Sequence, residues 1–114
     1  MTPLNMQALQ IMKELEDARL APLRRKGVSR RKLRLDGMLG VDVHTCQEAL
    51  SRKMGISHDY AQSLCHALCE DGFLVRTEAG RYTFTPKAIE AMVKDLSKRS
   101  FRRGTVETLL KYFR

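Results

Sequence analysis

Two short helical patterns separated by a tight turn constrain the fold more than any other feature of the sequence. Residues 45–48, "TCQE", form a capping box, which marks a helix start because its hydroxyl and carboxylate satisfy free backbone N–H groups. That helix should end at Gly55, since glycine readily adopts the left-handed conformation of a helix C-cap. Ser57 is a favourable N-cap for a second helix over His58–Asp71, and Gly72 ends it. The pattern predicts a helix-turn-helix.

A β-hairpin is predicted directly after the second helix. The runs "FLVRT" and "RYTFT" are rich in β-branched and aromatic residues, and the turn residues 78–80 join them. A shorter run at 41–43 is typical of an additional strand. Residues 85–86, Thr then Pro, provide a cap and a first-turn proline, so they predict a further helix that runs to residue 96.

The first helix is predicted to begin at Thr2, with a proline in the first helical position, and to end by Ala21–Pro22. Apolar residues recur along it at helical spacing, which indicates a face turned to the core. Lys13 and Asp17 are expected to point away from that face.

The length of 114 residues is that of one domain. We expect a single domain over residues 1–114, divided into a first helix, a basic arm or loop, a helix-turn-helix with its wing and following helix, and a basic hinge with a C-terminal helix. These parts are 1–22, 23–40, 41–96 and 97–114.

The central segment resembles the winged helix-turn-helix superfamily, in particular bacterial transcription regulators of the multiple-antibiotic-resistance type. The stretches "TCQEALSRKMGIS", "LCEDGFLVR" and "RYTFTPKA" carry the resemblance, which covers Val41 to about Met92. It implies a mainly α fold with a small β-hairpin wing. This chain departs from the pattern by a basic insertion after the first helix and by an extra C-terminal helix.

Positive charge is concentrated outside the predicted helix-turn-helix. The formal net charge is +8, which favours an anionic partner, and seven of the eleven residues from Arg24 to Arg34 are Lys or Arg. By contrast, no Lys or Arg occurs between Lys53 and Arg76. Residues 30–35 are compatible with a short helix or an extended arm, and the whole basic segment with a phosphate-binding element or a solvated loop.

If the second helix of the pair enters a DNA groove, neutral polar side chains would have to contact the bases. The alternative is a polar, solvated face. The candidate base-reading residues are Tyr60, Gln62, Ser63 and His66.

Cations elsewhere would then contact the DNA backbone, because phosphate contacts supply affinity and position. In the resembled family the wing contributes such contacts, although wing arginines can equally keep a sheet edge soluble. The candidate backbone-contacting residues are Arg24, Arg25, Lys26, Arg30, Arg31, Lys32, Arg34, Arg76, Arg81, Arg102 and Arg103.

The predicted C-terminal helix has one apolar face and is too short to be stable alone. We expect it to form a dimer contact, or else to pack on its own domain. The residues of this face are Val106, Leu109, Leu110 and Phe113.

Catalytic and metal-binding patterns are not found in the sequence. The histidines and cysteines lack metal-ligand spacing, so Cys65 is expected in the core and Cys69 half-buried. We therefore expect no metal, no cofactor and no enzymatic activity. The three cysteines suit a reducing cytoplasm, and no run is long and apolar enough to span a membrane or to act as a signal peptide.

Together these features predict a sequence-specific regulator that binds double-stranded DNA as a homodimeric, cytoplasmic repressor, with any small-molecule effector left open. The alternative is a winged-helix module that binds proteins, or a binder of structured RNA. In either alternative the basic segments give nonspecific affinity for nucleic acid.

Overall fold

The computed structural model describes residues 2–98, and for residues 96–98 the backbone only. The elements, in chain order, are α1 (Pro3–Arg25), α2 (Arg30–Leu35), β1 (Val41–Asp42), α3 (Val43–Met54), α4 (His58–Glu70), β2 (Leu74–Arg76), β3 (Arg81–Phe84) and α5 (Pro86–Lys98). Among these helices, none combines the length and the apolar character that crossing a membrane requires.

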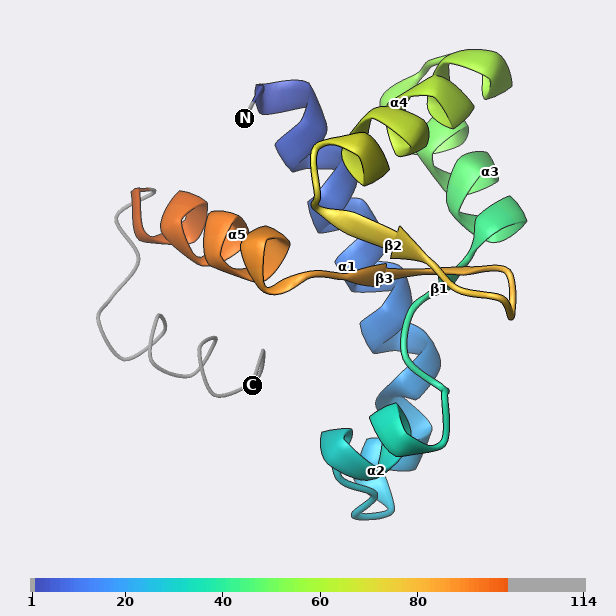
Figure 1. The fold of residues 1–114 in the computed structure, drawn as a ribbon, viewed down its shortest axis with the longest axis vertical. Helices are drawn as coiled ribbons and strands as arrows, with labels where there is room; N and C mark the ends of the chain where they lie inside the picture. Colours follow the sequence, from blue (N-terminus) through green and yellow to red (C-terminus); the bar gives the residue numbers. More distant parts are fainter. Residues whose placement is uncertain (1, 99–114) are drawn as a thin grey trace.

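The strands form one antiparallel sheet in the order β1-β3-β2 (Figure 1). Tyr82 of β3 pairs with Val41 on one side and with Arg76 on the other. The predicted hairpin and the predicted short strand are therefore both present. A mainly helical chain with a small three-stranded sheet in this order is compatible with a winged-helix-like architecture, which confirms the predicted fold class at this level.

The turn between α3 and α4 has the predicted caps. Gly55 adopts the left-handed conformation with φ 66°, and the Ser57 hydroxyl accepts a 3.1 Å hydrogen bond from the Tyr60 N–H. The predicted start of α3 is wrong, because Asp42, not Thr45, is the N-cap and its carboxylate accepts from the Thr45 N–H at 3.1 Å. The strand ends at Asp42, so the next residue is already helical.

The core lies around α1, which contacts α3, α4, α5 and β1. Leu9 and Met12 of α1 are fully buried, as are Leu50 of α3 and Leu68 of α4, while Tyr82 closes the core from the sheet. In Figure 1 α1 runs from the upper part of the molecule, beside α4, to the lower part, beside α2. The two ends of this one helix therefore connect the helix-turn-helix to the basic segment.

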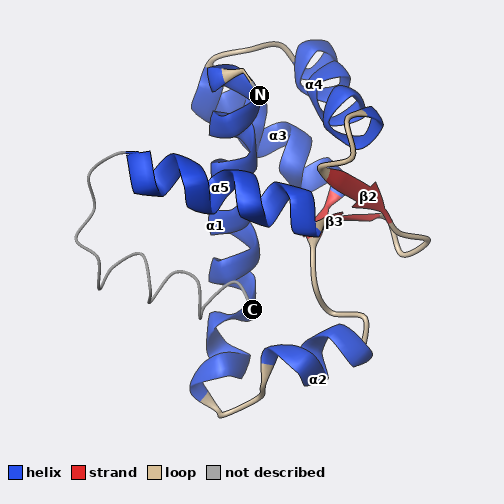
Figure 2. Cartoon of the chain, turned by 60° about the vertical axis from the view of Figure 1, so that its left-hand side comes forward, coloured by secondary structure: helices blue, strands red, loops and turns tan. Residues whose placement is uncertain are grey.

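The basic segment, 23–40, contains the last turn of α1 and all of α2. Helix α1 continues through Pro22 to Arg25 instead of ending at Ala21–Pro22, and residues 30–35 form α2, the helical form of the two considered (Figure 2). Ser29 caps α2, and Leu33 is 1% exposed because it packs inward. The predicted C-terminal helix, with Arg102, Arg103 and its apolar face (Val106, Leu109, Leu110 and Phe113), lies outside the described residues.

Candidate functional site

The outer face of α4 presents the four predicted base-reading side chains to solvent. Gln62, Ser63 and His66 are exposed, and Tyr60 is 48% exposed. Gln62, Ser63 and His66 line a shallow depression of about 310 Å³ together with Ala67 and Glu70. The inward stripe of α4, by contrast, is buried, so the helix is amphipathic as expected.

A second, more apolar groove of about 410 Å³ lies where the N-terminal end of α1 meets α4. Ser63 and Ala67 line both hollows, so the two hollows form one surface. We call it the α1/α4 surface. The residues lining the groove are Thr2, Leu4, Asn5, Tyr60, Ser63, Leu64 and Ala67.

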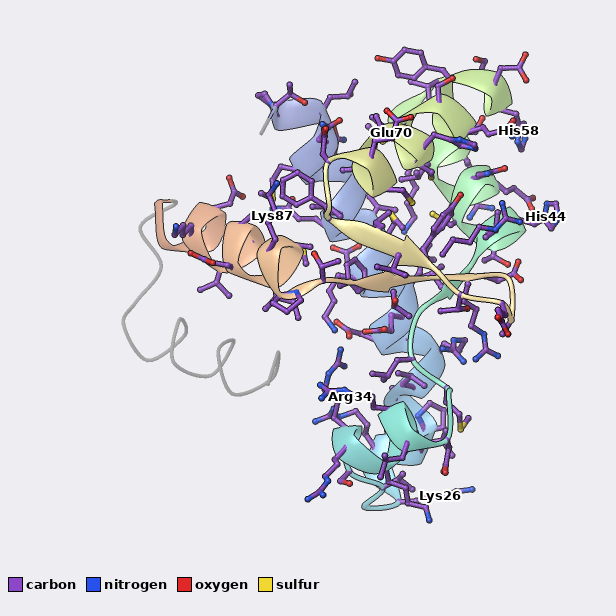
Figure 3. All side chains as sticks on the ribbon, viewed as in Figure 1. Lys26, Arg34, His44, His58, Glu70 and Lys87 are labelled. Carbon is purple, nitrogen blue, oxygen red and sulfur yellow. The ribbon has the colours of Figure 1, made fainter. Side chains whose placement is uncertain are left out.

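The exposed cations of the basic segment lie at the opposite end of α1. We call this group the basic knob; it consists of Arg25, Lys26, Arg31, Lys32 and Arg34, all exposed. Figure 3 shows Lys26 and Arg34 at one end of the molecule and His58 and Glu70 at the other. The 23 residues of α1 correspond to about 34 Å of helix. The structure therefore does not bring the predicted base-reading residues and the cations of the basic knob together.

A buried ionic network holds α2 on α1, and Glu16 is its centre. One carboxylate oxygen, Oε1, lies 2.8 Å from Lys13 Nζ and 3.3 Å from Arg30 Nη2, and the other, Oε2, accepts a 2.7 Å hydrogen bond from the Gly40 N–H. Glu16 is fully buried, and Lys13 and Arg30 are 5% and 9% exposed. Arg30 is thus buried in this network and is not part of an exposed basic surface, and Lys13 does not point away from the core as predicted.

The network favours the charged form of Glu16. Burial has the largest single effect and raises the pKa of this carboxyl, but Lys13, Arg30 and the Gly40 N–H together hold the pKa below its usual value of 4.5. Sequence reasoning missed Glu16. One local signal was its spacing of three residues from Lys13, which is more often a surface pair. The other was its position four residues from both Met12 and Leu20, on the apolar face of the helix.

Two further arginines fix the loop between α2 and β1. Arg19 donates to the carbonyl oxygens of Met38 and Gly40, the latter at 2.8 Å, and Arg81 donates to the Gly37 carbonyl at 2.9 Å. Arg81 therefore ties the sheet to the basic segment, while Arg76 is exposed on β2. Arg24, at the end of α1, is half-buried and takes part in interactions within the fold.

Cys65 and Cys69 lie where the sequence analysis predicts them. Cys65 is fully buried and Cys69 half-buried, and Cys46 Sγ lies 3.9 Å from Cys65 Sγ across α3 and α4. The hydrogen-bond contact with Cys65 has the largest effect on the pKa of Cys46, and burial has the next largest. Both raise the pKa, so the Cys46 thiol remains protonated. Within residues 2–98 no three His, Cys, Asp or Glu side chains are grouped as a metal site would require.

A comparison with protein-family models identifies the family of this chain. The model of the Nse1 family, described as the Nse1 non-SMC component of the SMC5-6 complex, matches residues 1–92. The chain belongs to the Nse1 family. No curated protein matches it significantly, and no solved structure does.

Membership of the Nse1 family corrects several predictions. The resemblance to bacterial regulators of the multiple-antibiotic-resistance type is wrong, and so are the predicted repressor function and the DNA-binding homodimer, because Nse1 is a subunit of a multi-protein complex. The three stretches that carry the resemblance contain helix caps, turns and a hairpin. Many small helical domains share these features, whatever they bind. The alternative, a protein-interaction module, agrees better with the family.

Proposed function

We propose that this chain is a protein-interaction subunit of an SMC5-6-type complex, with a winged-helix architecture and without catalytic activity of its own. The match of the Nse1 family model to residues 1–92 carries the proposal, since it includes nearly all of the described fold. The same assignment favours a nuclear location over the predicted cytoplasm.

The α1/α4 surface is the part of the fold that best fits a protein partner. Interface centres are enriched in tyrosine and depleted of charge, and small apolar hollows accept anchoring side chains. Tyr60, half-exposed beside a groove that Leu4 and Leu64 line, has these properties. The absence of Lys and Arg from α4 argues against phosphate as its ligand.

Co-purification with the SMC5-6 complex tests this proposal. The full chain, tagged and expressed in cells that contain the complex, should recover the SMC subunits. The double substitution Tyr60→Ala and Ser63→Arg should lower the recovery about tenfold or more, because it removes the aromatic anchor and places a charge at the groove. Both side chains are exposed, so the fold should not change.

Val75→Ala is the matched control, since Val75 is similarly exposed at 53% but lies on β2. It should leave recovery unchanged. If the parent chain recovers no SMC subunits, the proposed function is wrong; if both variants recover them like the parent, the α1/α4 surface is not the interface.

A further inference from the structure

The cations of the basic knob lack acidic partners within the described part of the chain. All five are exposed, and no ion pair involves any of them among residues 2–98. Asp36 is the only acidic residue between Ala18 and Val41. Repulsion among neighbouring cations disfavours such a cluster, so an anionic partner would stabilise it.

An exposed leucine lies within this cluster. Leu35 is 77% exposed, more than Tyr60 or Val75, the other large apolar residues recorded as exposed among the described residues. Residues three and four apart share one face of a helix, so Arg31, Arg34 and Leu35 lie side by side on α2. Leu33 and Arg30 occupy the face that α2 buries. The outer face of α2 therefore offers two guanidinium groups and one apolar side chain.

This face is held rigidly. Leu33 and the Glu16–Arg30 ion pair fix α2 on α1, and Arg19 and Arg81 hold the loop that follows. A preorganised surface loses less conformational entropy when it binds, so contacts of ordinary strength are sufficient.

We propose that the basic knob binds an acidic segment of a partner protein, whose carboxylates pair with Arg31 and Arg34 and whose apolar side chain covers Leu35. Arginine forms bidentate hydrogen bonds with a carboxylate, which matches the two guanidinium groups. The partner's being a protein rests on the proposed function.

Two observations favour a protein segment over nucleic acid. A phosphodiester backbone has no apolar group that could cover the Leu35 side chain. In a complex with nucleic acid this side chain would stay in water, or phosphate groups would lose their hydration against it. Unpaired bases are usually bound by stacking on aromatic rings, and residues 18–40 contain no aromatic residue.

Fluorescence anisotropy with defined probes tests the inference on the full chain. The first probe is a labelled peptide of Glu and Asp residues interrupted by Leu and Phe, and the second has Ser in place of Leu and Phe. The third is a mixed-sequence DNA duplex, at the same salt concentration. We expect the first probe to bind at least about fivefold more tightly than the second, since burial of apolar surface adds to the charge pairing, and also more tightly than the duplex.

Variants of the outer face identify the contacts. The double variant Arg31→Gln, Arg34→Gln should bind both peptides about tenfold or more weakly than the parent. The double variant Arg31→Lys, Arg34→Lys should lose less affinity, because lysine keeps the positive charge but cannot form the bidentate hydrogen bonds. Leu35→Ala should weaken the first probe about fivefold and leave the second unchanged.

Matched controls carry the same changes elsewhere. Arg52→Gln with Lys53→Gln removes two exposed cations of α3, and Val75→Ala truncates an exposed side chain of β2. Neither control should change the affinity for any probe, apart from the small loss that follows from a lower net charge. The second probe, which has no apolar residues, shows the size of that loss.

Three results would overturn the inference. The first is equal affinity for the two peptides. The second is tighter binding of the duplex than of the first peptide, with no effect of Leu35→Ala. The third is self-association of the chain that sedimentation detects in the parent and no longer detects in the Arg31→Gln, Arg34→Gln variant. None of these assays contains an SMC subunit. Failure here is therefore distinct from failure of the proposed function, which co-purification alone decides.

Discussion

Replacing Glu16 by glutamine tests whether the buried ionic network stabilises the fold. Glutamine keeps the size of the side chain and an oxygen that can accept from the Gly40 N–H, but it removes the negative charge that faces Lys13 and Arg30. The change therefore isolates the electrostatic part of the contact.

The expected loss follows from what each cation retains. Lys13 Nζ is also 3.1 Å from Asp17 Oδ1, so Lys13 keeps a partner. Arg30, at 9% exposure, loses the one ion pair that it forms within the described residues. Removing one partner of a buried pair costs about 3–5 kcal/mol, and the remaining pair of Lys13 places the expected loss near the lower end, about 3 kcal/mol. This is a large share of the roughly 5–15 kcal/mol by which such domains are stable.

Urea denaturation followed by circular dichroism measures this loss. With a slope of about 1–3 kcal/mol per M urea, the midpoint should fall by about 1–3 M. Glu90→Gln is the control, because Glu90 forms a pair of similar length with Lys94, 2.9 Å, that is fully exposed; no measurable change is expected. A loss under about 1 kcal/mol for Glu16→Gln would refute the view that this network fixes α2 to α1.

The same carboxyl predicts how stability depends on pH. The folded protein lowers the pKa of Glu16 below 4.5, so its contribution is fully present above about pH 4.5 and is lost as the pH falls through the lower folded value. The free energy of unfolding should decrease over that acidic range in the parent chain and less steeply in the Glu16→Gln variant. Parallel curves for the two proteins would contradict this assignment.

Two further predictions concern backbone and thiols. Gly40→Ala should destabilise the fold by about 3 kcal/mol, because φ is +103° and a Cβ atom would lie 2.6 Å from the Tyr82 carbonyl oxygen. Gly55→Ala should cost about 1 kcal/mol, because φ is +66° but the space around the Cβ position is open. Urea denaturation of both variants measures the two losses. In the native protein a thiol reagent should modify half-buried Cys69 before fully buried Cys46 and Cys65, which peptide mass spectrometry can resolve.

The part of the fold that sequence reasoning predicted depends on local signals. The left-handed Gly55, the Ser57 cap and the turn before Arg81 each need only a few neighbouring residues to specify them. The start of α3 was misplaced because Asp42 and Thr45 are both good caps, and only the length of the sheet pairing selects between them.

The buried network could not be predicted in the same way. Glu16 contacts Arg30 and Gly40 across 14 and 24 residues of sequence. Helical spacing places Glu16 on the buried face with Met12 and Leu20, unlike exposed Glu14, but it does not indicate which distant groups pair with it. For residues 30–35 of the basic segment the sequence leaves a short helix and an extended arm open, because seven cations in eleven residues are compatible with both. The burial of Leu33 and Arg30, which makes these residues a helix, depends on where α1 ends.

The wrong functional prediction rested on the resemblance to bacterial regulators and on a net charge whose position in the fold the sequence does not show. A charge of +8 indicates an anionic partner, but it does not say which surface that partner meets. The basic knob and the α4 face are separated by most of the length of α1. The whole helix is about 34 Å long, roughly four Debye lengths at physiological salt. At that distance the charge of the knob adds little to the electrostatic potential at the α4 face. The two surfaces are therefore proposed as separate interfaces, each with its own partner.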